Sequence, residues 1–152
     1  MPIKDYSMPM DVNDIMECIP HRYPFLLIDR ILEVTPNERI VAIKNISYSD
    51  PYLQGHFPGN PLVPGVLLVE GMAQASAVLG HLSTENGLKT CYLTEINSSR
   101  FRKPVVPGDR LRIELSVLRK RLPFFWFDAQ AYVDTEVVAE VKFSALMKQN
   151  DS

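Results

Sequence analysis

The sequence predicts an α+β fold in which a curled antiparallel sheet wraps around one long central helix. Residues 66–83 would be apolar on nearly every side of a helix, so that helix should be buried. Residues 109–122 and 137–147 alternate apolar and polar side chains, which is the pattern of strands that bury one face. Because the 66–83 helix is the only long apolar element available to cover that face, the sheet has to pack around it.

Length and composition favour one globular domain over residues 1–152. A chain of 152 residues can bury a sizeable core, and it contains no linker, repeat or low-complexity segment. Hydrophobic residues make up 46% and charged residues 22%, as in globular rather than disordered proteins. The net charge of -2 provides no general attraction to nucleic acid, so we expect no nucleic-acid partner.

Cysteine usage and the N-terminus favour the cytoplasm. Cys18 and Cys91 match no metal or redox spacing and are expected to be free thiols in a reducing compartment. Residues 1–7 lack a positive start followed by an apolar run, so no signal peptide is expected. Polar residues interrupt the apolar stretch 66–82, which indicates a buried helix rather than a membrane span.

Each element has its own local signal. A short helix over about residues 12–19 would be capped by Asp11 or Asn13 and ended by Pro20. Residues 50–65 hold four prolines and three glycines and predict an irregular loop, which leads into the central helix over about residues 66–83, ended by Gly87. The predicted strands are residues 25–34, 39–47, 90–96, 99–103 after a bend, 109–122, 125–133 and 137–147.

His56 lies in the Pro/Gly-rich loop, in the run GHFPGNP, and is the first candidate catalytic residue. Phe57, before Pro58, lies in a stretch with little backbone freedom, which would fix the direction of the imidazole. An imidazole titrates near neutral pH and suits a general base. The alternative is a surface or capping histidine without a catalytic role.

Glu70 is the first charged residue of the apolar helix and the second candidate. A carboxyl buried on such a helix is uncommon unless it is paired or neutral, and burial would keep a proton available for donation. The alternative is a carboxylate that accepts hydrogen bonds at a subunit interface. Gln74 lies one turn later on the same face and could orient the acid, or could simply be bonded to backbone.

Gly65 and Val66 should open the central helix. Backbone N–H groups in a first helical turn lack intrahelical acceptors, and the helix dipole there favours negative charge. An oxygen that gains negative charge during a reaction would therefore be stabilised at this position. A helix start after Pro64 without a binding role is compatible with the same pattern.

Positive charge gathers between residues 100 and 121. Eight basic residues and two acidic ones give this stretch a charge of +6, whereas the rest of the chain sums to -8. An acidic partner protein would be attracted to such a stretch, although a solvated strand face is the ordinary explanation. The candidate docking residues are Arg100, Arg102, Lys103, Arg119, Lys120 and Arg121.

Four segments carry a resemblance to a known family. They are residues 20–30 (PHRYPFLLIDR), 55–61 (GHFPGNP), 64–66 (PGV) and 100–109 (RFRKPVVPGD). In this order the chain resembles the 3-hydroxyacyl-[acyl-carrier-protein] dehydratases of the FabZ type, from about residue 15 to residue 147. The resemblance implies the hotdog fold, which agrees with the plan derived above.

The resemblance also implies a reaction and an assembly. A (3R)-3-hydroxyacyl group on acyl carrier protein would be dehydrated to a trans-2-enoyl group in fatty acid or related acyl-chain synthesis. His56 would be the base and Glu70 of the neighbouring subunit the acid, in a homodimer that forms a hexamer as a trimer of dimers. A cis peptide bond between His56 and a buried Phe57 is expected. No metal or redox cofactor is expected. The substrate would be held on the phosphopantetheine arm of the carrier.

Two alternatives remain from the sequence: a hotdog-fold acyl thioesterase and a non-catalytic acyl-binding module. Dehydration is favoured because both the loop histidine and the helix acid are present. The aromatic run at residues 124–127 and Glu95 depart from the family pattern. The run could pack in the core or at an interface, or it could form a wall of the acyl tunnel.

Overall fold

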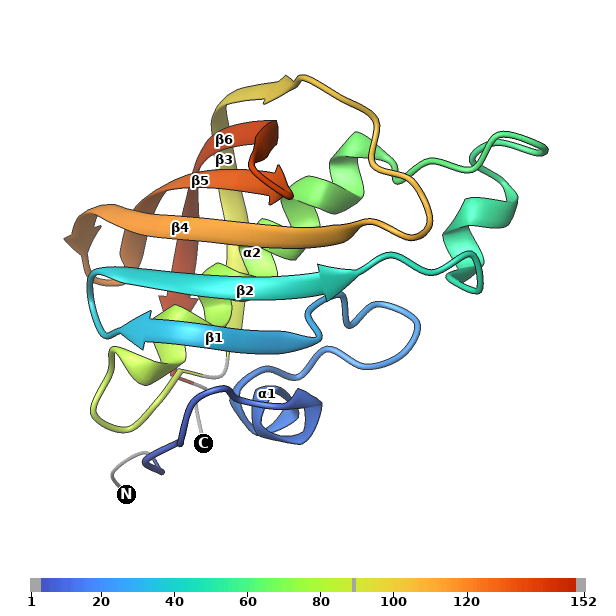
Figure 1. The fold of residues 1–152 in the computed structure, drawn as a ribbon. Coiled ribbons are helices and arrows are strands. Elements are labelled where there is room, and N and C mark those ends of the chain that lie inside the picture. Colours follow the sequence, from blue (N-terminus) through green and yellow to red (C-terminus); the bar gives the residue numbers. More distant parts are fainter. Residues whose placement is uncertain (1–3, 89, 150–152) are drawn as a thin grey trace.

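The computed structural model describes residues 4–88 and 90–149 as one sheet and two α-helices (Figure 1). The helices are α1 (Val12–Cys18) and α2 (Gly65–Leu82), and a short 3-10 helix covers Pro51–Gln54. The strands are β1 (Arg30–Thr35), β2 (Arg39–Asn45), β3 (Thr90–Phe101), β4 (Arg110–Arg121), β5 (Phe124–Val133) and β6 (Glu136–Lys148).

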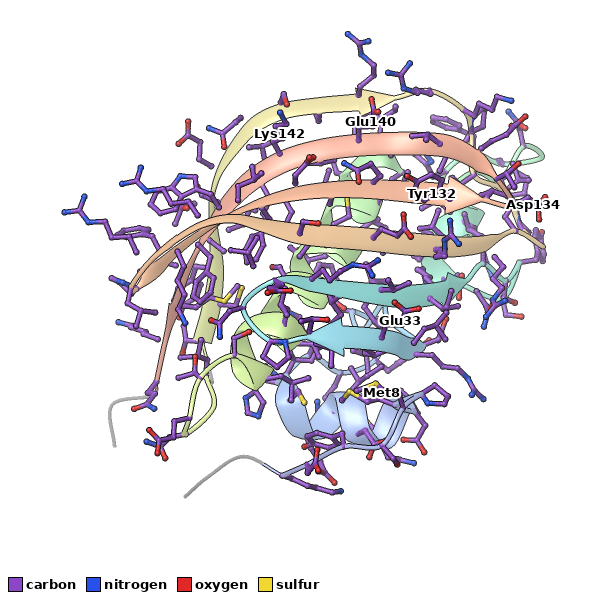
Figure 2. All side chains as sticks on the ribbon, turned by 60° about the vertical axis from the view of Figure 1, so that its left-hand side comes forward. Met8, Glu33, Tyr132, Asp134, Glu140 and Lys142 are labelled. Carbon is purple, nitrogen blue, oxygen red and sulfur yellow. The ribbon has the colours of Figure 1, made fainter. Side chains whose placement is uncertain are left out.

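The sheet is antiparallel throughout, in the order β1-β2-β4-β5-β6-β3. It curls around α2, which contacts β2, β3, β4, β5 and β6 (Figure 1). The expected alternation is confirmed, since Leu111, Ile113 and Leu115 are buried whereas Glu140 and Lys142 lie on the outer polar face (Figure 2). One long helix inside a curled sheet is the hotdog arrangement.

The core lies between α2 and the inner face of the sheet. Phe125, Phe127 and Phe143 are fully buried, and the rings of Phe127 and Phe143 lie 5.2 Å apart. By length and composition α2 could cross a membrane, but 67% of its apolar window is buried in the fold, as in the core helix of a soluble protein. In the aromatic run, Phe125 and Phe127 pack in the core, whereas Phe124 and Trp126 lie on the opposite face, Phe124 exposed and Trp126 partly exposed.

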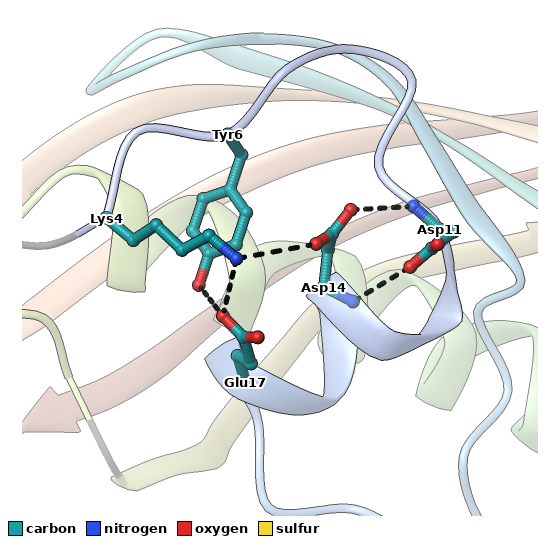
Figure 3. A network of polar contacts seen from close by, with 5 residues as sticks. All are labelled: Lys4, Tyr6, Asp11, Asp14 and Glu17. Atoms are coloured by element: carbon teal, nitrogen blue, oxygen red, sulfur yellow. Dashed lines mark hydrogen bonds and ion pairs between the residues drawn. The ribbon is translucent and has the colours of Figure 1, made fainter.

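The N-terminal segment holds α1 through a polar network (Figure 3). Asp11 and Asp14 form a reciprocal capping box at distances of 3.0 and 3.1 Å, so Asp11 rather than Asn13 is the cap. Glu17 accepts hydrogen bonds from Tyr6 and Lys4. Arg22 then donates to the carbonyls of Met16, Ile19 and His21, which fixes the chain that leaves the helix.

The expected strand over residues 25–34 is wrong for residues 25–29, since β1 begins at Arg30 and the backbone groups of residues 25 and 27 find partners outside the sheet. The N–H of Phe25 donates to Arg22 in a turn at 2.8 Å. The N–H of Leu27 donates to Gln74 Oε1 at 2.8 Å, and the carbonyl of Phe25 accepts from Gln74 Nε2 at 2.7 Å. The buried side chain of Gln74 on α2 therefore makes the hydrogen bonds that a neighbouring strand would otherwise make with residues 25 and 27.

Two further details differ from the expectation. The helix α2 covers Gly65–Leu82, close to the expected range 66–83, but Ser83 rather than Gly87 is its C-cap, and the Ser83 and Thr84 hydroxyls donate to the carbonyls of Leu79 and Gly80. The predicted break between residues 96 and 99 is absent. The strand β3 runs continuously, and two shifts in its register with β6 absorb the bend.

Replacement of Gln74 by leucine should destabilise the protein by about 1–3 kcal/mol, because the buried N–H of Leu27 would lose its acceptor. Urea unfolding at fixed protein concentration measures the loss. Gln54→Leu makes the same chemical change at an exposed position and should have little effect. An unchanged midpoint for Gln74→Leu would show that other contacts hold residues 25–27.

Candidate active site

The backbone of Leu62 fixes the His56 side chain. His56 Nδ1 lies 2.8 Å from the carbonyl oxygen of Leu62, and the N–H of Leu62 donates to the carbonyl of His56 at 2.9 Å. Since a carbonyl oxygen only accepts, the ring proton has to lie on Nδ1. Nε2 therefore keeps its lone pair, and this is the arrangement that a general base needs.

A tight turn brings Leu62 back beside His56. Phe57 and Asn60 exchange backbone hydrogen bonds at 3.1 and 2.9 Å, and Gly59 takes a φ of 74° that side chains disfavour. The His56–Phe57 peptide bond is cis, as expected. Phe57 stacks on the imidazole with ring centroids 4.1 Å apart, but it is 50% exposed in the single chain rather than buried.

The start of α2 presents unpaired backbone donors. Pro64 is the N-cap, and its carbonyl accepts from Leu67 and Leu68, which leaves the N–H groups of Gly65 and Val66 without intrahelical acceptors. A Cβ on Gly65 would come within 3.1 Å of the Phe101 ring, so glycine lets this aromatic side chain lie against the helix start.

Glu70 is held on one side by Gln74. Gln74 Nε2 donates to Glu70 Oε1 at 3.0 Å, and Gln74 itself is only 1% exposed. The Glu70 side chain is 23% exposed, so the full burial expected from the sequence is not seen in the single chain. Gln74 therefore has both possible roles at once, since it orients the carboxyl and binds backbone.

His56 and Glu70 occupy separate surroundings within one chain. In the part of the chain that the structure describes, no hydrogen bond or ion pair joins them. Five residues of helix, a rise of about 7.5 Å, separate the N-terminus of α2 from Glu70. His21 lies closer to the acid, with its Nε2 3.7 Å from Glu70 Oε1. Sequence reasoning missed His21 as a site residue, although the run PHRYP contains it.

A cavity of about 340 Å³ opens beside the helix start. Gly65 and Leu62 line it on one side, and Phe101, Arg102 and Lys103 line it on the other. The cavity therefore connects the backbone donors of α2 to a basic surface. Among residues 4–88 and 90–149, no group of three His, Cys, Asp or Glu side chains could hold a metal ion.

The structure divides the basic stretch into two groups. Arg100, Arg102 and Lys103 lie at the end of β3 that adjoins α2, whereas residues 119–121 lie at the hairpin between β4 and β5. Arg102 is paired with Glu140 and Lys103 with Glu136. The six candidate docking residues therefore do not form one patch in the single chain, because the strands carry the two groups apart.

The hairpin group has different contacts. The Arg119 guanidinium lies 4.9 Å from the centre of the Trp126 ring, and Lys120 donates to Asn37 at 2.7 Å. These contacts explain both residues as parts of an exposed sheet face. Glu95 is likewise exposed, on β3.

The chain is similar to known dehydratases. The FabA-like domain model matches residues 19–142. The 3-hydroxyacyl-[acyl-carrier-protein] dehydratase FabZ of Geobacter metallireducens is 46% identical over 143 residues, which cover 93% of this chain and 95% of that protein.

Solved structures show the same fold at low identity. The dehydratase heterocomplex ApeI:P from Xenorhabdus doucetiae has a TM-score of 0.77 at 18% identity and covers 97% of this chain and 94% of its own. A hypothetical thioesterase with coenzyme A from Streptococcus pneumoniae has a TM-score of 0.60 at 16% identity, with 80% and 87% covered. The family match and the similarity to the Geobacter enzyme show that the chain belongs to the FabA-like family, among the FabZ-type 3-hydroxyacyl-[acyl-carrier-protein] dehydratases.

Proposed function

We propose that this chain is a hydro-lyase that converts (3R)-3-hydroxyacyl-[acyl-carrier-protein] to trans-2-enoyl-[acyl-carrier-protein] in the synthesis of fatty acids or related acyl chains. The observation that carries the proposal is the His56 tautomer, because the Leu62 carbonyl leaves Nε2 free to accept a proton. The FabZ relatives support the same activity. The thioesterase and acyl-binding alternatives gain no comparable support, since the thioesterase likeness is one of fold alone.

The proposed reaction uses three parts of the site. The thioester oxygen accepts hydrogen bonds from the N–H groups of Gly65 and Val66, which stabilise the charge that develops there. His56 Nε2 removes a proton from C2, and the electrons of that C–H bond form the C2–C3 double bond. Glu70 gives its proton to the C3 hydroxyl, which leaves as water.

The proposed site combines His56 of one subunit with Glu70 of the partner subunit. The strand β3 is one of the two edges of the sheet, and its exposed side chains include Tyr92, Leu93, Ile96 and Phe101. A long edge strand with apolar side chains is suited to pair with a second copy. The proposal therefore includes a homodimer through β3, and the resemblance adds a hexamer built as a trimer of dimers.

Acyl carrier protein is the proposed partner. Arg102 and Lys103 line the cavity that reaches Gly65, so a carrier bound there could extend its phosphopantetheine arm to the backbone donors. Acid–base chemistry of this kind needs no metal or redox group, and we include no other cofactor. We also propose that the protein acts in the cytoplasm and has no membrane or nucleic-acid partner.

His56→Ala and Glu70→Ala should each lower turnover by about two to four orders of magnitude, because each removes a proton-transfer group. Mass spectrometry of carrier-bound substrate measures the enoyl product and would also detect thioester cleavage. Near-normal turnover by either folded variant would remove that residue from the mechanism. Release of free acid by the wild type would favour a thioesterase.

Mixing the two inactive variants should restore part of the activity if each site takes residues from two chains. A hybrid dimer of His56→Ala and Glu70→Ala subunits has one site with both native groups. The variants are unfolded together, refolded and assayed, and native mass spectrometry measures the hybrid fraction. Hybrids that form without activity would place both groups of each site within one chain.

Charge reversal at Arg102 and Lys103 should reduce kcat/KM for carrier-bound substrate and weaken its dependence on salt, because the carrier is acidic. Turnover of a small pantetheine thioester should change little. The matched control is charge reversal at Arg119 and Arg121, which lie at the distant hairpin. Equal losses on both substrates would assign Arg102 and Lys103 a structural role.

A further inference from the structure

His21 is a polar residue of the site to which the mechanism above gives no role. Its Nε2 lies 3.7 Å from Glu70 Oε1, and both side chains are 23% exposed. This distance is too long for a hydrogen bond, but it places the ring nitrogen beside the carboxylate oxygen. Catalytic contacts of this kind are commonly long in a free enzyme and shorten when substrate binds.

The other ring nitrogen determines which tautomer His21 adopts. His21 Nδ1 is buried and has no hydrogen-bond partner in the described part of the chain. A proton on Nδ1 would be a buried donor without an acceptor, whereas a proton on Nε2 faces a carboxylate oxygen. The neutral imidazole with its proton on Nε2 is therefore the favoured form.

The charged surroundings also favour neutral His21. Burial lowers the pKa of His21, Glu70 raises it, and the neighbouring Arg22 lowers it. The Arg22 guanidinium is bound to carbonyls at the end of α1, so its position is fixed. From β3, Cys91 lines a small cavity with His21 and Cys18, and burial raises the pKa of Cys91 to about 12, which keeps that thiol neutral.

The two oxygens of Glu70 differ in their contacts. Gln74 Nε2 donates to Oε1 at 3.0 Å, and His21 Nε2 approaches the same atom. No hydrogen bond or ion pair to Oε2 occurs among the residues described by the structure. The Gln74 hydrogen bond and the nearby N–H of neutral His21 favour negative charge on Oε1, which leaves the other oxygen as the preferred place for a proton.

We propose that His21 is a positioning residue for the acid, which with Gln74 fixes Glu70 Oε1 and leaves Oε2 as the oxygen that delivers the proton. This inference rests on the proposed function, in which Glu70 protonates the leaving hydroxyl. Once Glu70 has given up its proton, the His21 and Gln74 N–H groups stabilise the resulting carboxylate. His21 itself exchanges no proton with the substrate.

The test replaces His21 by phenylalanine, which keeps a ring but has no N–H group, and by glutamine, which keeps a neutral donor. His21→Phe should lower kcat by about 10- to 100-fold, the loss expected for one hydrogen bond to a charged group, with KM nearly unchanged. His21→Gln should recover most of that loss. Tyr23→Phe, at an exposed position of the same loop, is the matched control.

The pH profile of kcat separates positioning from a structural role. Dehydration needs protonated Glu70, so activity falls at high pH as this proton is lost. A donor to the carboxylate favours proton loss, and its removal in His21→Phe should move that fall to higher pH. The partner's His56 governs the opposite, acidic side of the profile, which should not move.

Two results would overturn the inference: an unmoved alkaline side in folded His21→Phe, or a His21→Gln variant as slow as His21→Phe. Nitrogen-15 NMR of the wild type adds a measurement that needs no variant. It should show the His21 proton on Nε2 at neutral pH, and protons on both nitrogens would also contradict the proposal. Glu70→Gln distinguishes a failure of this inference from a failure of the proposed function, because normal turnover by that variant would refute the proposed function itself.

Discussion

The enclosure of α2 by the curled sheet is the constraint on which the rest of the structure depends. A helix with apolar side chains on nearly every side has to be surrounded, and only a sheet that curls can do this with one layer. Every polar group on the helix then needs a partner nearby. Gln74 finds its partners in the backbone of residues 25–27, and this contact decides where the first strand begins.

The same constraint places the chemistry. Functional groups can reach solvent at the N-terminus of α2 or along the strip of its surface that the sheet leaves open. Gly65 and Val66 use the first position, and Glu70 uses the second. His56 is brought to the helix start by a loop whose own backbone bonds determine the direction of the ring. The backbone therefore fixes the His56 ring, whereas the buried side chain of Gln74 holds Glu70.

Much of the architecture could be predicted from period and composition. The helix and the late strands followed from apolar spacing, since burial of one face imposes that spacing. The start of β1 could not be predicted, because the acceptor for Leu27 lies 47 residues away on α2. The split of the basic stretch was also hidden, since residues close in sequence lie at opposite ends of strand β4 and of its neighbours.

At the candidate site, the loop chemistry marked His56 and the apolar context marked Glu70, and their catalytic roles stay predictions. The contact of His21 with Glu70 could not be predicted, because it joins the segment after α1 to the middle of α2. The sequence pattern of a single helix or loop can identify a residue of unusual chemistry. It cannot identify the contact partner that a distant element supplies, because the packing of the chain determines that contact.

The hydrogen bond between His56 Nδ1 and the Leu62 carbonyl has a consequence for isotope exchange. With one ring nitrogen occupied by backbone, a proton that arrives on Nε2 has to depart from Nε2. In the proposed mechanism, that atom faces the carbon from which the proton came while substrate is bound. Return of the original hydrogen to C2 therefore competes directly with its loss to water, and bound substrate would keep a deuterium label at C2 through many reversals of the first step.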